Sequence, residues 1–202
     1  MNEEVIEGAE RARKDTDLVR AFLAGDKVAF DRLVLKYQNR VFNTCYRLLG
    51  NYEEANDSAQ DIFVKVFRSL KRFRFESSFS TWIYRIAVNT CRNKLRSLQY
   101  RYRRKMIRID EQKDPEEESY AIEIGDESQS PVKELERKEK GILIQKAIDS
   151  LPEGQKTMIV LRDIEGLTYD EIATVTGLNP GTVRSKLARG RQKLRKYLRG
   201  IN

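Results

Sequence analysis

The sequence has no histidine among its 202 residues. Histidine is the usual side chain for proton transfer near neutral pH, and it is a frequent zinc ligand. Catalysis by serine–histidine–aspartate or cysteine–histidine groups is therefore excluded, and so are the common zinc sites. We expect a protein that is not an enzyme and that carries no metal and no cofactor.

Cysteine and long apolar runs are also scarce. The two cysteines, Cys45 and Cys91, lie far apart and lack the CxxC spacing of metal sites, so we expect buried free thiols. No apolar run reaches the roughly 18 residues of a membrane-spanning helix, and the charged N-terminus does not resemble a signal peptide. These absences predict a soluble, cytoplasmic protein without membrane insertion.

Charge, in contrast, is abundant and is segregated along the chain. Lysine and arginine outnumber aspartate and glutamate by 39 to 31, which gives a net charge of +8. Residues 92–108 and 181–202 each contain eight basic residues and no acid, whereas residues 110–127 contain nine acidic residues and one lysine. Such an acidic stretch buries too little apolar surface to offset the entropy lost on ordering it.

We therefore predict two small helical domains, at 1–97 and 134–202, joined by a flexible acidic linker at 98–133. The two basic blocks suit two separate nucleic-acid contacts, and an acidic segment between them would stay off the nucleic acid or imitate it. A simpler interpretation is that the acidic residues only balance the basic ones for solubility.

The first domain has the apolar spacing of helices. Apolar residues recur at steps of three and four over 30–49 and 55–70, which predicts two amphipathic helices. A shorter helix is predicted at 16–24, and another begins at Trp82. The segment 71–81 interleaves basic, aromatic and hydroxyl side chains without a helical period, which predicts a loop. Strand patterns are nearly absent, so we expect an all-α fold.

The loop 71–81 and the helix after it have the side chains of a single-strand binder. Bases suit phosphates, aromatic rings stack on nucleobases, and hydroxyl and amide groups bond base edges. Phe73 lies between two arginines, and Asn89 and Arg92 share one polar stripe of the helix. The spacing of Phe79 continues into an apolar face, which favours a place in the core for that ring.

The second domain has the spacing of a helix-turn-helix. Thr168 and Glu171 are placed as a T-x-x-E capping box, and Gly177 permits a sharp turn after that helix. Asn179 and Pro180 suit the start of the next helix. Two amphipathic segments upstream complete a four-helix domain. The last helix has a predicted buried stripe that consists of Val183, Leu187, Leu194 and Leu198.

The opposite face of this last helix is basic and polar. Its arginines suit guanines and phosphates, and Ser185 and Gln192 can bond base edges. We therefore predict that it reads duplex DNA, and a merely solvated basic face is the alternative. The predicted outward residues are Arg184, Ser185, Ala188, Arg189, Gln192 and Arg195.

Three motifs occur together in this chain, namely FSTWIYRIAVN at 79–89, GLTYDEIA at 166–173 and GTVRSK at 181–186. With them, the chain resembles a bacterial extracytoplasmic-function (ECF) RNA polymerase sigma factor of the sigma-70 family. The resemblance covers nearly all of the predicted helical residues. It implies that the first domain is region 2, which binds core RNA polymerase and melts the minus-10 promoter element. It also implies that the second domain is region 4, which reads the minus-35 element as duplex.

The same resemblance implies roles for individual residues. The core polymerase would be bound by Asp57, Gln60, Asp61 and Phe63. The minus-10 element would be bound by Phe73, Ser77, Phe79, Asn89 and Arg92, with one non-template base captured in a pocket. The minus-35 element would be bound by Arg162, Arg184, Ser185, Lys186 and Arg189.

The resemblance also implies partners beyond polymerase and promoter DNA. Family members are commonly held inactive by an anti-sigma factor, and the acidic linker would thread the channels of the polymerase where it imitates RNA. The chain departs from the family at Asn56, where an acid is common, and at Asp61, where a glutamate is common.

Two other functions are alternatives to this interpretation. A helix-turn-helix regulator with an effector or dimerisation domain would explain the C-terminal motif, although it leaves the basic and aromatic loop 71–81 without a purpose. A phosphoryl-transfer enzyme would need a phosphate-binding glycine-rich loop, and the sequence contains none.

Overall fold

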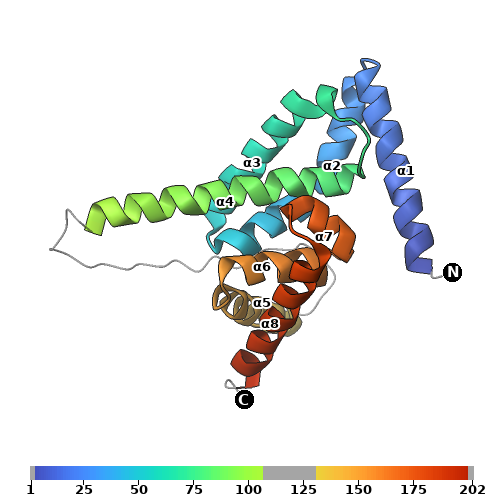
Figure 1. Cartoon of the computed structure of the whole chain (residues 1–202). Helices are drawn as coiled ribbons and strands as arrows, with labels where there is room; N and C mark the ends of the chain where they lie inside the picture. Colours follow the sequence, from blue (N-terminus) through green and yellow to red (C-terminus); the bar gives the residue numbers. More distant parts are fainter. Residues whose placement is uncertain (1–2, 107–130, 200–202) are drawn as a thin grey trace.

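The computed structural model describes residues 3–106 and 131–199, and every regular element in these two ranges is helical (Figure 1). The predicted all-α class is therefore confirmed. In chain order the elements are α1 (Glu3–Leu23), α2 (Lys27–Leu49), α3 (Tyr52–Ser69), the short 3-10 helix η1 (Leu70–Arg72), α4 (Phe79–Met106), α5 (Pro131–Asp149), α6 (Glu153–Ile159), the π-helical turn η2 (Val160–Ile164), α7 (Tyr169–Thr176) and α8 (Pro180–Arg199).

Helices α1 to α4 form the N-terminal half, in which the long helix α4 crosses α2 and α3 (Figure 1). The predicted apolar stripes are the buried ones. On α2, Leu33, Tyr37 and Val41 follow one another at steps of four and are almost fully buried. Ile62 and Val66 of α3 are equally buried, so the two amphipathic helices predicted here are confirmed.

Two local predictions for this half need correction. Helix α1 begins at Glu3 instead of near residue 16. The prediction missed its first half because few apolar residues there reveal a helical period. The loop predicted at 71–81 is shorter, since η1 reaches Arg72 and α4 starts at Phe79. Helix α4 starts at Phe79 because Ser78 caps it, since the Ser78 hydroxyl accepts a hydrogen bond from the Thr81 amide at 3.1 Å.

The predicted linker at 98–133 lies mostly outside the described residues. At its two ends the chain is helical, because α4 continues to Met106 and α5 begins at Pro131. The domain limits and the flexibility of the acidic segment therefore stay predictions.

Helices α5 to α8 form the C-terminal half, and α7 and α8 make the predicted helix-turn-helix. The Thr168 hydroxyl accepts from the Glu171 amide, and the Glu171 carboxylate accepts from the Thr168 amide, which confirms the capping box. Gly177 ends α7 with a left-handed φ of 71°. The Asn179 side chain accepts from the Thr182 amide at 2.7 Å and starts α8.

The buried face of α8 differs in part from the predicted one. Val183 and Leu187 are buried as expected, but Leu198 is 42% exposed because it lies beyond the helices that cover the earlier turns. Gly190 is buried instead, and a methyl group on it would lie 3.1 Å from Ile159. The absence of a side chain at Gly190 therefore lets α8 approach α6 closely.

The two halves pack against each other, with α7 on α4 and with α5, α6 and η2 on α2 (Figure 1). Buried apolar side chains form one cluster that includes residues of both halves. Cys45 and Cys91 are buried free thiols, as predicted, and the pKa of Cys45 is raised by its hydrogen bond with Cys91 and by burial.

The described residues offer neither a membrane span nor a metal site. None of the helices in the described ranges is long and apolar enough to cross a bilayer. Likewise, acidic and cysteine side chains in the described part of the chain form no group suited to a metal ion.

The turn at Gly177 provides a test of the helix-turn-helix geometry. An L-residue in the left-handed region is strained, so Gly177→Ala should lower the free energy of unfolding by about 1 kcal/mol. Gly181→Ala is the matched control, because Gly181 has no positive φ and an added methyl group would make only ordinary contacts. Urea unfolding followed by circular dichroism measures both, and equal losses would contradict this account of the turn.

Candidate nucleic-acid and polymerase interfaces

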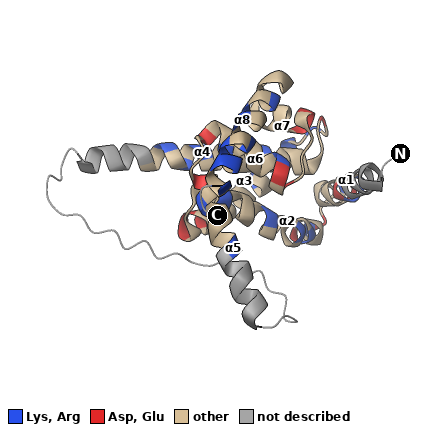
Figure 2. Ribbon diagram, turned by 90° about the horizontal axis from the view of Figure 1, so that it is seen from below, with Lys and Arg blue, Asp and Glu red and all other residues tan. Residues whose placement is uncertain are grey.

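The outward face of α8 is exposed along most of its length. Figure 2 colours the positions of lysine and arginine blue along the ribbon, and several of them are on this helix. The residues predicted to face outward are all exposed, namely Arg184, Ser185, Ala188, Arg189, Gln192 and Arg195. Lys186 differs, because its ammonium group lies beside Gly154 of α6 and the residue is only partly exposed. The structure therefore puts Lys186 at the edge of this face.

Tyr169 joins two of the predicted minus-35 residues. Its ring lies 5.2 Å from the guanidinium carbon of Arg162 and 6.0 Å from that of Arg184. Arg162 also donates a hydrogen bond to the carbonyl of Leu167 at 2.7 Å. An aromatic face attracts such cations, and it restricts where they can move. Tyr169 is therefore placed to orient two predicted minus-35 residues, a position that spacing alone did not indicate.

A bidentate ion pair between Arg191 and Asp163 lies two turns after Arg184 on α8. The Nε and Nη2 atoms of Arg191 donate to the Asp163 carboxylate at 3.1 Å and 2.5 Å. This hydrogen bonding raises the pKa of Arg191. The pair ties α8 to η2, so it orients the helix that carries the outward arginines.

The rings of the loop before α4 form an aromatic cluster. The centroid of Phe73 lies 4.8 Å from Phe75, 5.1 Å from Trp82 and 6.4 Å from Phe79. Phe73 is 8% exposed, and Phe79 is 2% exposed and packs on Tyr37. The core position favoured for Phe79 is thus found, and Phe73 is buried with it.

Phe75 is the exposed ring of this cluster, and sequence reasoning missed it. It is 40% exposed and has a φ of 58°, the only positive φ of a residue other than glycine in the described ranges. Such a conformation is unusual for a bulky L-residue. The Arg20 guanidinium lies 5.7 Å from its ring. No periodicity signals a left-handed residue, so only the structure could find it.

The predicted polar stripe of α4 is present, but its residues are not equally exposed. Asn89 is exposed, together with Arg85 and Arg96. Arg92 is half-buried and lies 3.7 Å from the Glu153 carboxylate of α6. Ser77 is half-exposed in the loop. The structure thus leaves Asn89 accessible, whereas Arg92 contacts the C-terminal half.

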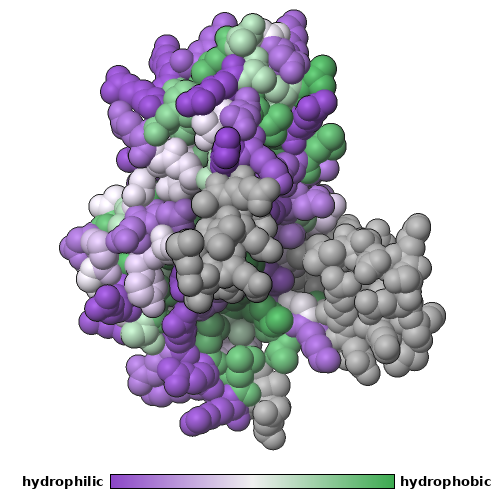
Figure 3. Space-filling view, turned by 90° about the vertical axis from the view of Figure 1, so that its right-hand side faces the viewer, coloured by the Kyte–Doolittle hydropathy of each residue, from purple (hydrophilic) through white to green (hydrophobic). Residues whose placement is uncertain are grey.

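The residues predicted to bind polymerase lie on the outer face of α3. Asp57, Gln60 and Asp61 are exposed, and Phe63 is half-buried. Exposed apolar side chains continue this surface where α1, α2 and α3 meet, and Figure 3 shows such hydrophobic groups among hydrophilic ones near that end of the molecule. They are Leu23, Val28, Val64 and Phe67. Exposed apolar side chains near exposed charged ones are compatible with a protein-binding surface.

Comparisons with known proteins agree with this geometry. The family model described as Sigma-70 region 2 matches residues 33–101, and that described as Sigma-70, region 4 matches residues 142–194. The chain is 39% identical over 190 residues to RNA polymerase sigma-H factor of Pseudomonas aeruginosa, covering 93% of this chain and 95% of the relative. This chain belongs to the ECF sigma factors of the sigma-70 family.

Further relatives and solved structures are consistent with that assignment. ECF RNA polymerase sigma-E factor of Haemophilus influenzae is 36% identical over 180 residues, which are 89% of this chain and 93% of the relative. CnrH in complex with the cytosolic domain of CnrY shares the fold, with a TM-score of 0.66 at 22% identity over 94% of this chain and 99% of that one. RpoE of Bartonella quintana, in complex with the anti-sigma factor NepR, has a TM-score of 0.63 at 20% identity over 84% of this chain and 96% of that one.

The established function follows from the family. This sigma factor binds core RNA polymerase and directs promoter-specific initiation of transcription. Sigma factors are not enzymes, so the chemistry of RNA synthesis belongs to the polymerase. The matched ranges place most of α2, all of α3 and most of α4 in region 2, and the end of α5, all of α6 and α7 and most of α8 in region 4.

The ring of Tyr169 can be tested through its two arginines. Tyr169→Ala should weaken minus-35 binding by roughly two- to fivefold, the value of one exposed cation–aromatic contact. Tyr169→Phe keeps the ring and should bind nearly as well as the parent. Holoenzyme competition for a duplex minus-35 fragment, taken from a promoter found by run-off transcription, measures this. Equal weakening by both substitutions would show that the ring itself is unimportant.

Proposed function

We propose that this sigma factor reads the minus-35 element with the outward face of α8 and opens the minus-10 element with the loop 73–78 and the stripe on α4. One observation carries the first part of the proposal. A helix held by buried Val183, Leu187 and Gly190 presents an unbroken exposed row of arginine, serine and glutamine side chains. Such a helix has the form of a recognition helix for the major groove.

On the minus-35 element, each residue has a separate part in this proposal. Arg184 and Arg189 contact guanine edges or phosphates, and Ser185 bonds a base edge. Lys186 and Arg162 lie at the margins of the face and contact backbone phosphates. Tyr169 holds Arg162 and Arg184 in place from behind.

At the minus-10 element, a non-template base leaves the duplex and is captured by region 2. Extruding a base costs a few kcal/mol in lost stacking and pairing, and a protein pocket recovers this by new contacts. The proposed residues are Phe73, Ser77, Phe79, Asn89 and Arg92, and Phe79 acts from the core by supporting the ring of Phe73. Because Phe73 is covered by Phe75, capture at Phe73 requires the strained Phe75 to move aside.

Region 2 also carries the proposed contact with core polymerase. Asp57, Gln60, Asp61 and Phe63 of α3 supply this surface, and the exposed apolar group beside them extends it. We place the acidic segment within 98–133 in the channels of the polymerase, where its charge imitates RNA.

The proposal includes a location and a regulator. The sigma factor acts in the cytoplasm, where its polymerase is found. An anti-sigma factor restrains it, and support comes from the solved complex of the Bartonella quintana sigma factor with its anti-sigma factor.

Arg184 provides a test of minus-35 recognition. Arg184→Ala should weaken holoenzyme binding to a minus-35 duplex by about 1–3 kcal/mol and relax the sequence preference at one position. Lys146→Ala is the control, since it removes an exposed positive charge of region 4 from α5, which is not part of the proposed reading face. Binding is measured at a fixed salt concentration, and an equal loss in both variants would reduce the role of Arg184 to general charge.

Phe73 and Asn89 test base capture. Phe73→Ala and Asn89→Ala should leave the closed promoter complex largely intact but slow melting by about tenfold, since a stacking or hydrogen-bonding partner of the captured base is lost. Asn39→Ala, an exposed asparagine on α2, is the control. Permanganate reactivity of the minus-10 thymines on holoenzyme measures melting, and reactivity equal to that of the parent would refute the assignment.

A further inference from the structure

Glu165 of region 4 places a charged carboxylate inside the contact between the two regions. It follows η2, and its side chain is only 4% exposed. Thr44 of α2 donates a hydrogen bond to one carboxylate oxygen at 2.8 Å, and the hydroxyl of Tyr84 on α4 donates to the other. The Arg40 guanidinium lies 3.6 Å from the same second oxygen. All these partners belong to region 2.

Burial of the Glu165 carboxylate costs free energy unless its hydrogen-bonding and ionic partners are all in place. A carboxylate removed from water loses far more solvation than a single contact returns, so buried charges need both pairing and hydrogen bonds. Glu165 has both here. Burial and the neighbouring Glu165 raise the pKa of Tyr84, so its hydroxyl remains a donor. The cluster therefore stabilises the packed arrangement of regions 2 and 4, and it exists in no other arrangement of them.

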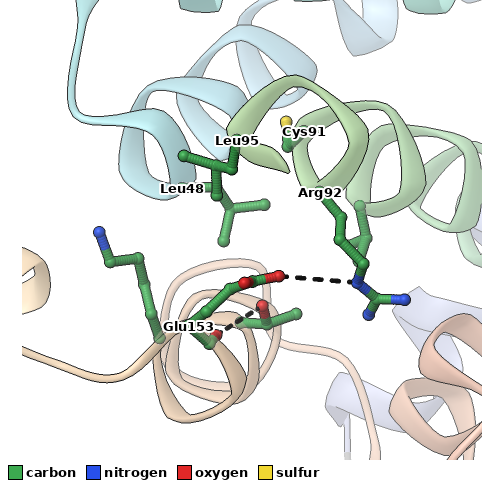
Figure 4. Close-up of a pocket in the computed structure, with 8 residues that line it drawn as sticks. Leu48, Cys91, Arg92, Leu95 and Glu153 are labelled. Carbon is green, nitrogen blue, oxygen red and sulfur yellow. Dashed lines mark hydrogen bonds and ion pairs between the residues drawn. The ribbon is translucent and has the colours of Figure 1, made fainter. Parts of the chain in front are cut away.

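The contacts around Glu165 follow the same division of donors and acceptors. Region 2 supplies Arg92, which lies 3.7 Å from the Glu153 carboxylate, and Figure 4 shows this ion pair beside the pocket between the regions. Thr81 of α4 donates to Glu171 of α7 at 3.4 Å. Region 4 thus places carboxylates on donors of region 2, and Arg92 is itself a proposed promoter contact.

In the packed arrangement the two proposed DNA-contacting surfaces lie too close together to reach both promoter elements. The two elements, by their names, lie about 25 base pairs apart, or about 85 Å at 3.4 Å per base pair. In the structure, Arg184 lies on Tyr169, and α7 touches α4 at Thr81, eight residues before Asn89. With a helix rise of 1.5 Å per residue, these contacts keep Arg184 and Asn89 within about 40 Å of each other.

We propose that Glu165 is an intramolecular latch. Its contacts with Arg40, Thr44 and Tyr84 hold regions 2 and 4 of the free sigma factor together until core polymerase separates them. The closed state rests on the contacts themselves, whereas its consequence for promoters rests on the proposed reading residues. Polymerase binding must then include the cost of breaking the latch, and the binding-competent fraction of the free chain is reduced accordingly.

The latch is tested first on the full-length chain without polymerase. Spin labels at Gln38→Cys and Lys193→Cys report the distance between α2 and α8. The native Cys45 and Cys91 are replaced by alanine in every sample, because Cys91 lines the pocket between the regions and would become accessible on opening. The parent should give one short, narrow distance. Glu165→Ala should raise the open population by about tenfold or more, since hydrogen bonds to a buried charge are strong.

Two further variants make the distance measurement specific. Tyr84→Phe keeps the ring but removes one donor, so it should open the chain less than Glu165→Ala and add little in the double variant. Asp170→Ala removes an exposed carboxylate from α7 and should leave the distance unchanged. A parent as open as Glu165→Ala, or an equal opening by Asp170→Ala, would overturn the latch.

Polymerase binding separates this inference from the proposed function. Glu165→Ala should bind core polymerase more tightly by the same factor by which it opens the chain, and run-off transcription at saturating sigma factor should equal that of the parent. An open variant with unchanged affinity would overturn the restraining role. Absence of promoter-specific transcripts with the parent itself would contradict the proposed promoter reading and leave the distance result standing.

Discussion

The packing of region 2 on region 4 depends on the protein groups that replace water around one buried carboxylate. Glu165 leaves water only because Arg40, Thr44 and Tyr84 replace its hydration from the other region. The apolar contacts between α7 and α4 add stability to the same interface, but they tolerate sliding, whereas a hydrogen-bonded carboxylate has one position. The latch therefore makes the closed state a defined conformation, and not a loose collapse of two domains.

This constraint links packing to function. Some of the donors that bind carboxylates in the closed state lie on α4, the helix that carries the proposed contacts with the minus-10 element. Arg92 illustrates the exchange, since it is paired with Glu153 here and is available to a phosphate once the regions separate. The exposed face of α8 needs no such release, because its residues already point to solvent. Opening of the chain thus concerns spacing more than exposure.

The sequence predicted best where local rules are sufficient. The capping box at Thr168, the turn at Gly177 and the amphipathic stripes of α2 and α3 each follow from nearby residues, and the structure has them. It failed where distant contacts decide. Leu198 fits the stripe of α8 yet is 42% exposed, because the described residues leave this last turn uncovered. Phe75 has a left-handed φ of 58°, which periodicity does not reveal.

The sequence by itself determined the helical class, the helix-turn-helix and the family, because these depend on short patterns of polarity, caps and motif residues. Only the tertiary structure decided that Glu165 meets Tyr84, that Tyr169 lies between Arg162 and Arg184, and that Phe73 is covered. The first depends on how helices far apart in the chain pack together, and the other two depend on how loops and helix ends fold back on their neighbours. Their burial and their partners therefore have no local signal in the sequence.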